Sequence, residues 1–192
     1  MNPNSFSYYV INKPFDVLSQ FTDGLGRKTL SKYLGNIKGI YPVGRLDLDS
    51  EGLLLLTNDT QLTNFILNPI NNHEREYLCQ IEGIPNDSEL EKLEKGVIIE
   101  KKLTLPAKVK IIENPIVWDR IPPIRERINI LTCWISLTLV EGRNRQVRKM
   151  TAAIGHPTLR LIRVRIKNIL LNDLQPGKLR KLSEEEVRIL KI

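Results

Sequence analysis

One stretch decides the fold and the chemistry of this chain: Gly44-Arg45-Leu46-Asp47-Leu48-Asp49-Ser50-Glu51-Gly52, followed by the apolar run Leu53–Leu56. Ile40–Val43 lead into it as an expected strand, and Leu53–Leu56 suit a short, fully buried strand. Asp47 therefore lies in a polar loop between two expected strands. Because a buried carboxylate is costly unless it is paired, this arrangement predicts a carboxylate that is held rigidly at the mouth of a cleft.

The composition is that of an ordinary globular protein with an anionic partner. The chain has 192 residues, of which 41% are hydrophobic and 27% charged, enough for one domain or two small lobes with a real core. A net charge of +7 favours nucleic acid as the partner, with an acidic membrane surface second. No apolar stretch approaches the roughly 20 residues that cross a bilayer, and Met1–Tyr9 lacks the form of a signal peptide. We expect a cytoplasmic protein.

Several common kinds of catalytic site are disfavoured by the residues present. Cys79 and Cys133 lie in strand-like apolar stretches, so we expect buried reduced thiols. His73 and His156 lie in a polar connector and at a helix end, which disfavours both a nucleophile–histidine pair and a zinc site. A glycine-rich phosphate loop is also absent from the sequence. If the chain is an enzyme, a carboxylate carries the chemistry, without a metal or an organic cofactor.

Expected strands and helices are interspersed along the chain. Strands are expected over residues 8–12, 40–43, 53–56, 76–82, 97–100, 107–112, 133–140 and 162–166. Helices are expected over 28–34, 60–67, 145–154, from Asn86 or Ser88 to Lys95, and from Ser183 to Leu190. Within 76–82, Tyr77 shares a face with Cys79 and Ile81. In the last strand Arg163 and Arg165 are expected on a wet face. The irregular crossovers predict an α+β fold with a mixed or antiparallel sheet.

The acidic loop also suggests two metal-dependent sites. Asp47-x-Asp49-x-Glu51-Gly52 resembles the start of an EF-hand, but the twelfth position would be Asn58 rather than the bidentate glutamate. A magnesium nuclease fits clustered carboxylates better. Against it, Asp49 and Glu51 are equally well explained as solvated loop charges. A chelator that abolishes activity would identify the nuclease.

A second constellation is strongly basic: Glu141-Gly142-Arg143-Asn144-Arg145-Gln146-Val147-Arg148-Lys149-Met150. Residues 141–181 contain eleven Lys or Arg against two Asp or Glu. A strand end, a glycine turn and a helix start present Arg143, Arg145 and Arg148 close together, where helix N-terminal amides add to the attraction for phosphate. A solvated face explains single charges but not so one-sided a run. The segment predicts phosphate binding.

These motifs together resemble one family. The acidic stretch, with Leu53-Leu54 and Thr57-Asn58, is similar to the catalytic motif of RNA pseudouridine synthases. The basic stretch resembles the late motif of the branch that modifies small-subunit and large-subunit rRNA. Lys13-Pro14 resembles the first motif, and Leu159–Val164 with Leu174-x-Pro176-Gly177 resembles the C-terminal signature. The motifs occur in order between Tyr8 and Leu182.

The resemblance implies an α+β fold with a mixed, largely antiparallel sheet, in two lobes flanked by helices beside a basic catalytic cleft. The lobes would cover about 1–70 and about 71–192. It also implies that a flipped-out uridine of rRNA is isomerised to pseudouridine. Asp47 would be the nucleophile that attacks either C1′ or C6, Tyr77 would stack on the base, and Arg143 would pair with Asp47. Substrate RNA would be bound by Arg45, Arg145, Gln146, Arg148, Lys149, Arg163 and Arg165.

The resemblance is greatest to the E-type large-subunit rRNA synthases, which lack the N-terminal S4-type domain of other members. The catalytic region begins here at about residue 8, so we expect no S4 domain, and we expect a monomer with rRNA as its partner. The family commonly has Lys-x-Tyr where this chain has Arg75-Glu76-Tyr77. Arginine changes the hydrogen-bonding geometry, so the role of Arg75 is open. A catalytically inactive rRNA-binding or assembly module is the alternative, although binding alone requires neither Asp47 nor Tyr77.

Overall fold

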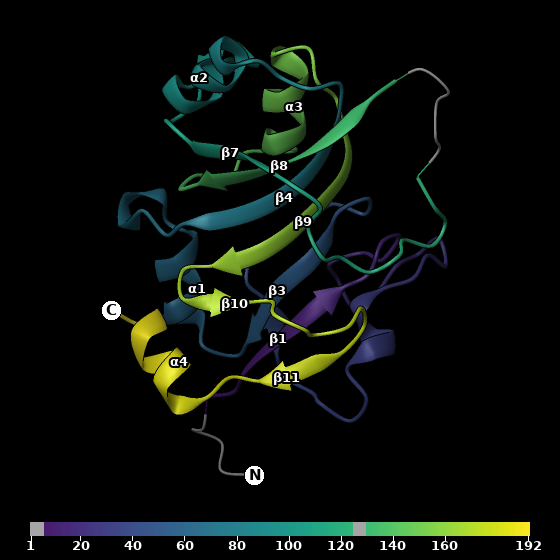
Figure 1. Ribbon diagram of the computed structural model, residues 1–192. Coiled ribbons are helices and arrows are strands. Elements are labelled where there is room, and N and C mark those ends of the chain that lie inside the picture. Colours follow the sequence, from purple (N-terminus) through teal and green to yellow (C-terminus); the bar gives the residue numbers. More distant parts are fainter. Residues whose placement is uncertain (1–5, 125–129) are drawn as a thin grey trace. The chain divides into compact units, whose positions relative to one another are not determined.

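A computed structural model describes residues 6–124 and 130–192, which form an α+β structure (Figure 1). The chain divides into two compact units. Unit 1 contains the residues up to His73 together with Arg163–Ile192, and unit 2 contains Glu74–Ile162. The sequence placed about 71–192 in one lobe, whereas the last segment belongs with the first. The reason is strand pairing, since β11 (Leu179–Lys181) pairs antiparallel with β1 (Tyr8–Lys13).

Unit 1 is built on a small antiparallel sheet in which β1 lies between β11 and β3 (Glu51–Thr57). Two short strands extend it: β2 (Tyr41–Pro42) pairs with β3, and β10 (Ile169–Leu170) pairs with the last residues of β9 (Thr158–Ile166). Every residue of β3 is buried. The expectation of a fully buried strand after the acidic loop is therefore confirmed.

The helices of unit 1 begin where their capping residues predict. Asp59 caps α1 (Thr60–Leu67) by accepting from the Leu62 amide at 2.9 Å, and Ser183 with Glu186 forms a capping box on α4 (Glu184–Leu190). The helix expected over 28–34 is only the 3₁₀ turn η1 (Leu30–Tyr33), and a second turn, η2 (Pro69–Asn71), follows α1. Asp59 also accepts from the Tyr8 hydroxyl and pairs with Lys191. These contacts tie the C-terminal helix to the first strand.

Unit 2 contains an antiparallel arrangement of three strands, with β8 (Thr132–Leu139) between β4 (Arg75–Glu82) and β7 (Lys108–Ile112). Its other elements are α2 (Asp87–Lys95), α3 (Gln146–Ala153) and the hairpin of β5 (Ile98–Ile99) with β6 (Lys102–Leu103). Alternate residues of β4 are buried, including Tyr77 and Cys79, which confirms the predicted shared face. Asn86 caps α2. Among the described residues, no helix is long and apolar enough to span a membrane.

Candidate active site

The loop that carries Asp47 connects β2 to β3 in unit 1, and its backbone is held on both sides of the aspartate. Ser19 holds Leu46 twice: its Oγ donates to the Leu46 carbonyl at 2.7 Å and accepts from the Leu46 amide at 3.1 Å. The carbonyl of Asp47 itself accepts from the Ser50 amide at 3.1 Å. Leu46 and Ser50 are buried, whereas Asp47 is half-buried and Arg45 is exposed. The loop is therefore a fixed turn in which Asp47 stays partly exposed.

A buried lysine, Lys13, hydrogen-bonds to the backbone of the same loop. Lys13 is fully buried at the end of β1, and its Nζ donates to the carbonyl oxygens of Pro14, Val17 and Leu48 at 2.9, 2.6 and 3.4 Å. The Leu48 carbonyl also accepts from the Asp16 amide at 3.0 Å. Burial lowers the pKa of Lys13 to about 8, although the nearby carboxylates of the acidic loop act in the opposite direction. Sequence reasoning used Lys13 only as a motif residue and as the strand end. The signal in the sequence was a lysine that directly continues a strand with a largely apolar start.

Gly52 lets the loop join β3 against another backbone segment. Its φ of 102° lies in the left-handed region, and a Cβ at this position would lie 2.3 Å from the Arg163 carbonyl oxygen. The Arg163 side chain continues the contact, because its Nε donates to the Leu53 carbonyl at 2.8 Å. Glycine is required here for both space and backbone conformation.

Tyr77, the predicted base-stacking residue, lies on β4 in unit 2, opposite Leu137 of β8. It is buried, with 9% of its surface exposed. Its neighbour on the same face, Cys79, is a free thiol whose pKa is raised by burial. Arg75, the departure from the family pattern, is also buried at the start of the strand.

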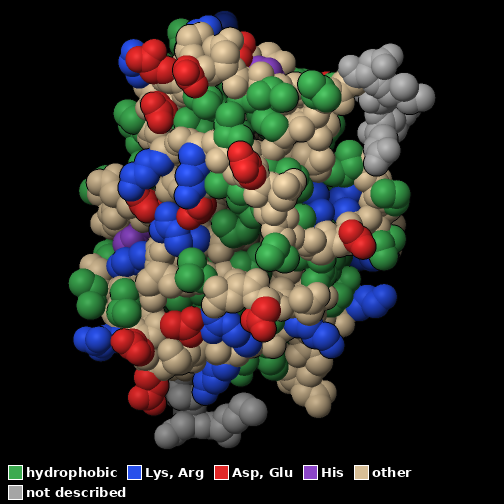
Figure 2. All heavy atoms as spheres, viewed as in Figure 1, with side chains coloured by type: hydrophobic (Ala, Val, Ile, Leu, Met, Phe, Trp, Pro, Cys, Tyr) green, Lys and Arg blue, Asp and Glu red, His purple; other side chains and the backbone are tan. Residues whose placement is uncertain are grey.

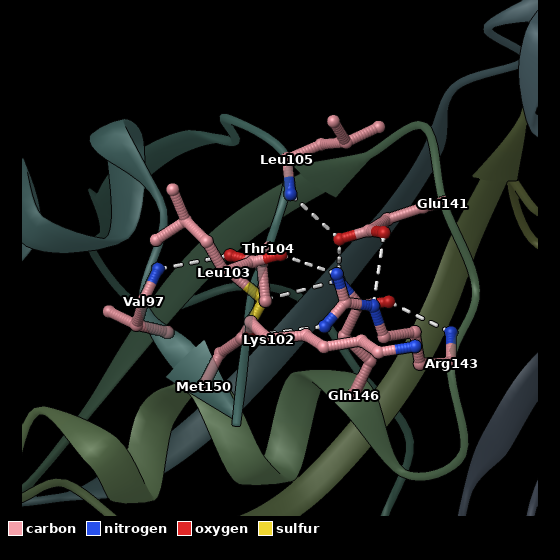
Figure 3. A network of polar contacts seen from close by, with 9 residues as sticks. All are labelled: Val97, Lys102, Leu103, Thr104, Leu105, Glu141, Arg143, Gln146 and Met150. Atoms are coloured by element: carbon pink, nitrogen blue, oxygen red, sulfur yellow. Dashed lines mark hydrogen bonds and ion pairs between the residues drawn. The ribbon is translucent and has the colours of Figure 1, made fainter. Parts of the chain in front are cut away.

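Figure 3 shows how the basic segment of unit 2 is organised around Glu141 and Arg143. Glu141 accepts from the Arg143 Nε at 3.2 Å and from the Gln146 Nε2 at 2.6 Å. Arg143 also donates from Nη1 and Nη2 to the carbonyl oxygens of Lys102 and Leu103 in the β6 strand. Three nitrogen atoms of the Arg143 guanidinium are thus engaged within unit 2, where they join the segment to the β5–β6 hairpin.

The predicted cations of the RNA-binding set differ in their exposure. Arg145 precedes α3 with a left-handed φ of 51° and is exposed. Arg148 and Lys149 are half-buried, and Lys149 pairs with Glu100 at 2.6 Å. Arg165 is half-buried in unit 1 and donates to the Lys167 carbonyl. On the face that Figure 2 shows, Lys and Arg side chains alternate with Asp and Glu, so the net positive charge is not one uninterrupted patch there.

Two residues of the predicted RNA-binding set, Gln146 and Arg163, are buried. Gln146 is 4% exposed, and its amide is used inside the loop: Oε1 accepts from the Arg143 amide at 2.8 Å while Nε2 donates to Glu141. Arg163 is also 4% exposed and is held by the Leu53 carbonyl. The prediction of a wet strand face was wrong at Arg163, because β9 is the neighbour of β3 in the sheet and the guanidinium is held against the β3 backbone at Leu53.

The division into units also separates the predicted site residues along the chain. Unit 1 carries Arg45, Asp47, Arg163 and Arg165, and unit 2 carries Tyr77, Arg143, Arg145, Gln146, Arg148 and Lys149. Across the described residues, no group of three His, Cys, Asp or Glu side chains is arranged to hold a metal ion.

Comparison with known proteins gives a family match over a span that includes the aspartate loop and the start of α3. The model of the RNA pseudouridylate synthase family matches residues 7–153. The chain belongs to this family. It is therefore an enzyme of the pseudouridine synthase class, whose members are isomerases.

Two curated relatives and one solved structure show how far the similarity extends. A protein of Vibrio parahaemolyticus named ribosomal large subunit pseudouridine synthase E is 52% identical over 90% of this chain and 72% of the relative. A protein of the same name from Xanthomonas campestris is 44% identical over 93% of this chain and 97% of the relative. A crystal structure titled pseudouridylate synthase aligns with a TM-score of 0.80 at 27% identity, over 97% of this chain and 74% of that one. The expected pseudouridine synthase fold is confirmed.

Proposed function

We propose that this pseudouridine synthase isomerises one uridine of large-subunit ribosomal RNA, with Asp47 as the nucleophile. The observation that supports the substrate is the similarity, over most of the chain, to relatives named as large-subunit enzymes. The support for the nucleophile is the loop geometry, in which the residues on either side of Asp47 are fixed by Ser19 and Lys13. A carboxylate held in this way needs little reorganisation before it attacks.

The reaction exchanges one bond of the nucleoside for another. The target uridine leaves its stack, the N1–C1′ bond breaks, the base turns while it is held, and the C5–C1′ bond forms. C5 loses a proton and N1 gains one, so that the product is an isomer of the substrate. Asp47 begins this sequence by attack at C1′ or at C6, and in either route the same carboxylate later departs. Tyr77 supplies the aromatic ring on which the base stacks.

The arginines divide between binding and support. We assign Arg143 a positioning role, because Glu141 and two backbone carbonyls occupy its guanidinium within unit 2; this replaces its predicted pairing with Asp47. Arg45 and Arg145 are exposed and are assigned to phosphate contacts, with Arg148, Lys149 and Arg165 as further contacts. We assign Gln146, in the first turn of α3, and Arg163, in β9, to the structural framework. The enzyme would act as a monomer in the cytoplasm.

Mapping of pseudouridine tests this proposal. Ribosomal RNA from a strain that lacks the protein is compared with wild-type RNA by a pseudouridine-specific carbodiimide label. We expect one position of the large-subunit RNA to lose the modification and to regain it when purified protein is added to an unmodified transcript. An unchanged map at every position would contradict the proposal, and so would restoration by a protein with Asn at position 47.

A further inference from the structure

Unit 2 contains a cavity of about 530 Å³ that none of the predicted site residues lines. The residues that matter to its chemistry are Gln80, Glu82, Trp118, Asp119, Thr132 and Arg160. Its volume is within the range of small-molecule binding sites, roughly 300–1,000 Å³. The cavity is therefore large enough to hold a molecule the size of a nucleobase or nucleotide.

Two planar groups form part of its wall. The guanidinium carbon of Arg160 lies 5.5 Å from the centre of the Trp118 ring. Arg160 is only 5% exposed, so its guanidinium is fixed by packing and holds the Trp118 ring beside it in place. Aromatic rings and guanidinium planes are the surfaces on which proteins stack the unpaired bases of RNA.

The remaining polar groups suit the edge of a base better than a phosphate. The carboxylates of Glu82 and Asp119 line the cavity and repel an anion, whereas they can accept from the ring and amino N–H groups of a base. The Gln80 amide is oriented by donating to the Thr132 hydroxyl at 3.2 Å. The wall is also supported, because Arg120 donates to the carbonyl oxygens of Pro122 and Pro123 at 2.9 and 3.0 Å.

We propose that this cavity binds an unstacked nucleobase of the RNA substrate, distinct from the uridine that is isomerised. The proposal rests on the proposed function, which supplies the RNA. Stacking on Trp118, which Arg160 holds in place, provides the affinity, and the carboxylates select bases by their N–H donors. The site would contribute to the choice of RNA without taking part in the chemistry.

Tryptophan emission tests occupancy without requiring turnover. The chain has two tryptophans, so Trp134→Phe leaves Trp118 as the single emitter. A large-subunit rRNA transcript is titrated into this variant, and a Trp118→Phe variant that retains Trp134 serves as the control. We expect saturable quenching of Trp118 with little change in the control. Unchanged Trp118 emission while the RNA is bound would overturn the proposal, even if the enzyme is active.

Measurements of RNA affinity are the second test of the proposed base site. Trp118→Ala should weaken binding of the transcript by roughly 5- to 100-fold, as expected for one lost stacking contact. The slope of binding against salt and the rate at saturating RNA should stay as in wild type, because no phosphate contact is lost. Trp118→Phe should restore most of the affinity, and Ile116→Ala, at a fully exposed position of the same segment, should bind like wild type. If wild type modifies RNA and Trp118→Ala binds it equally well, the base site is excluded and the proposed function stands.

Discussion

The ammonium of Lys13 lies 3.4 Å from the carbonyl oxygen of Leu48, the residue that follows Asp47. A fully buried cation at the end of the first strand thus fixes the backbone beside the proposed nucleophile. Burial lowers the pKa of this lysine, whereas the carboxylates of the acidic loop raise it. The turn that carries Asp47 is consequently coupled to the protonation state of one interior amine.

This coupling predicts a pH dependence of stability. The pKa of Lys13 is lowered to about 8 in the folded protein, so between pH 8 and 10 the unfolded chain binds a proton that the folded chain has released. The contribution of Lys13 to the free energy of unfolding therefore becomes more favourable to the folded state as the pH rises across that window, by at most about 3 kcal/mol. Lys13→Met should lack the rise. Urea unfolding of both proteins at pH 7 to 10 measures the difference, and identical pH profiles would show that the Lys13 pKa is not lowered.

Gly52→Ala should destabilise unit 1. The new Cβ would meet the Arg163 carbonyl at 2.3 Å, and the φ of 102° is unfavourable for alanine. We expect a loss of at least about 2 kcal/mol in the free energy of unfolding. Gly24→Ala is the matched control, since nothing lies within 4 Å of its Cβ position. Equal thermal unfolding midpoints for the two variants would refute the close approach of Gly52 to Arg163.

Arg145 and Gln146 are adjacent, but alanine at the two positions should have different effects, on RNA binding in the first case and on stability in the second. Arg145→Ala removes an exposed cation, so it should weaken RNA binding and flatten the salt slope by about 0.7–0.9 per phosphate contact. Gln146→Ala removes the acceptor of the Arg143 amide and one of the donors to the Glu141 carboxylate, so it should cost about 1–3 kcal/mol of stability. Filter binding at several salt concentrations, together with urea unfolding, separates the two roles. A shallower salt slope for Gln146→Ala would restore it as a direct RNA contact.

Tyr77→Phe separates the ring from the hydroxyl. The buried ring on β4 is kept, so RNA binding should stay within a few-fold of wild type. Any step that requires the hydroxyl should be slowed, which single-turnover kinetics at saturating RNA would detect. A rate equal to that of wild type would leave Tyr77 a stacking platform alone.

Much of the fold follows from local sequence. The apolar run after the acidic loop forms a fully buried strand, and Asp59, Asn86 and Ser183 each cap the helix that follows them. Local patterns could not show that the last segment belongs with the first, because the pairing of β11 with β1 joins residues far apart in sequence.

The site was harder to predict than the fold for a related reason. An arginine and a glutamine at the start of a helix look equally available in sequence, yet Arg145 is exposed while the Gln146 side chain donates to Glu141. Likewise, the alternation of residues in β9 predicted that Arg163 faces solvent. A local pattern could not show that Gly52 lies against the Arg163 backbone. The contact between Trp118 and Arg160 joins a loop to a strand some forty residues later, so no local sequence motif could predict it.

Single-turnover isomerisation by Asp47→Asn is the most direct test of the central claim. The amide is nearly isosteric with the carboxylate but is a poor nucleophile, and the variant keeps the Ser19 and Ser50 contacts with the backbone of Leu46 and Asp47. Asp49→Asn is the control on the same loop. With an unmodified large-subunit rRNA transcript, we predict no pseudouridine from Asp47→Asn, RNA affinity within a few-fold of wild type, and far more activity from Asp49→Asn. Substantial turnover by Asp47→Asn would contradict the assignment of Asp47 as the nucleophile.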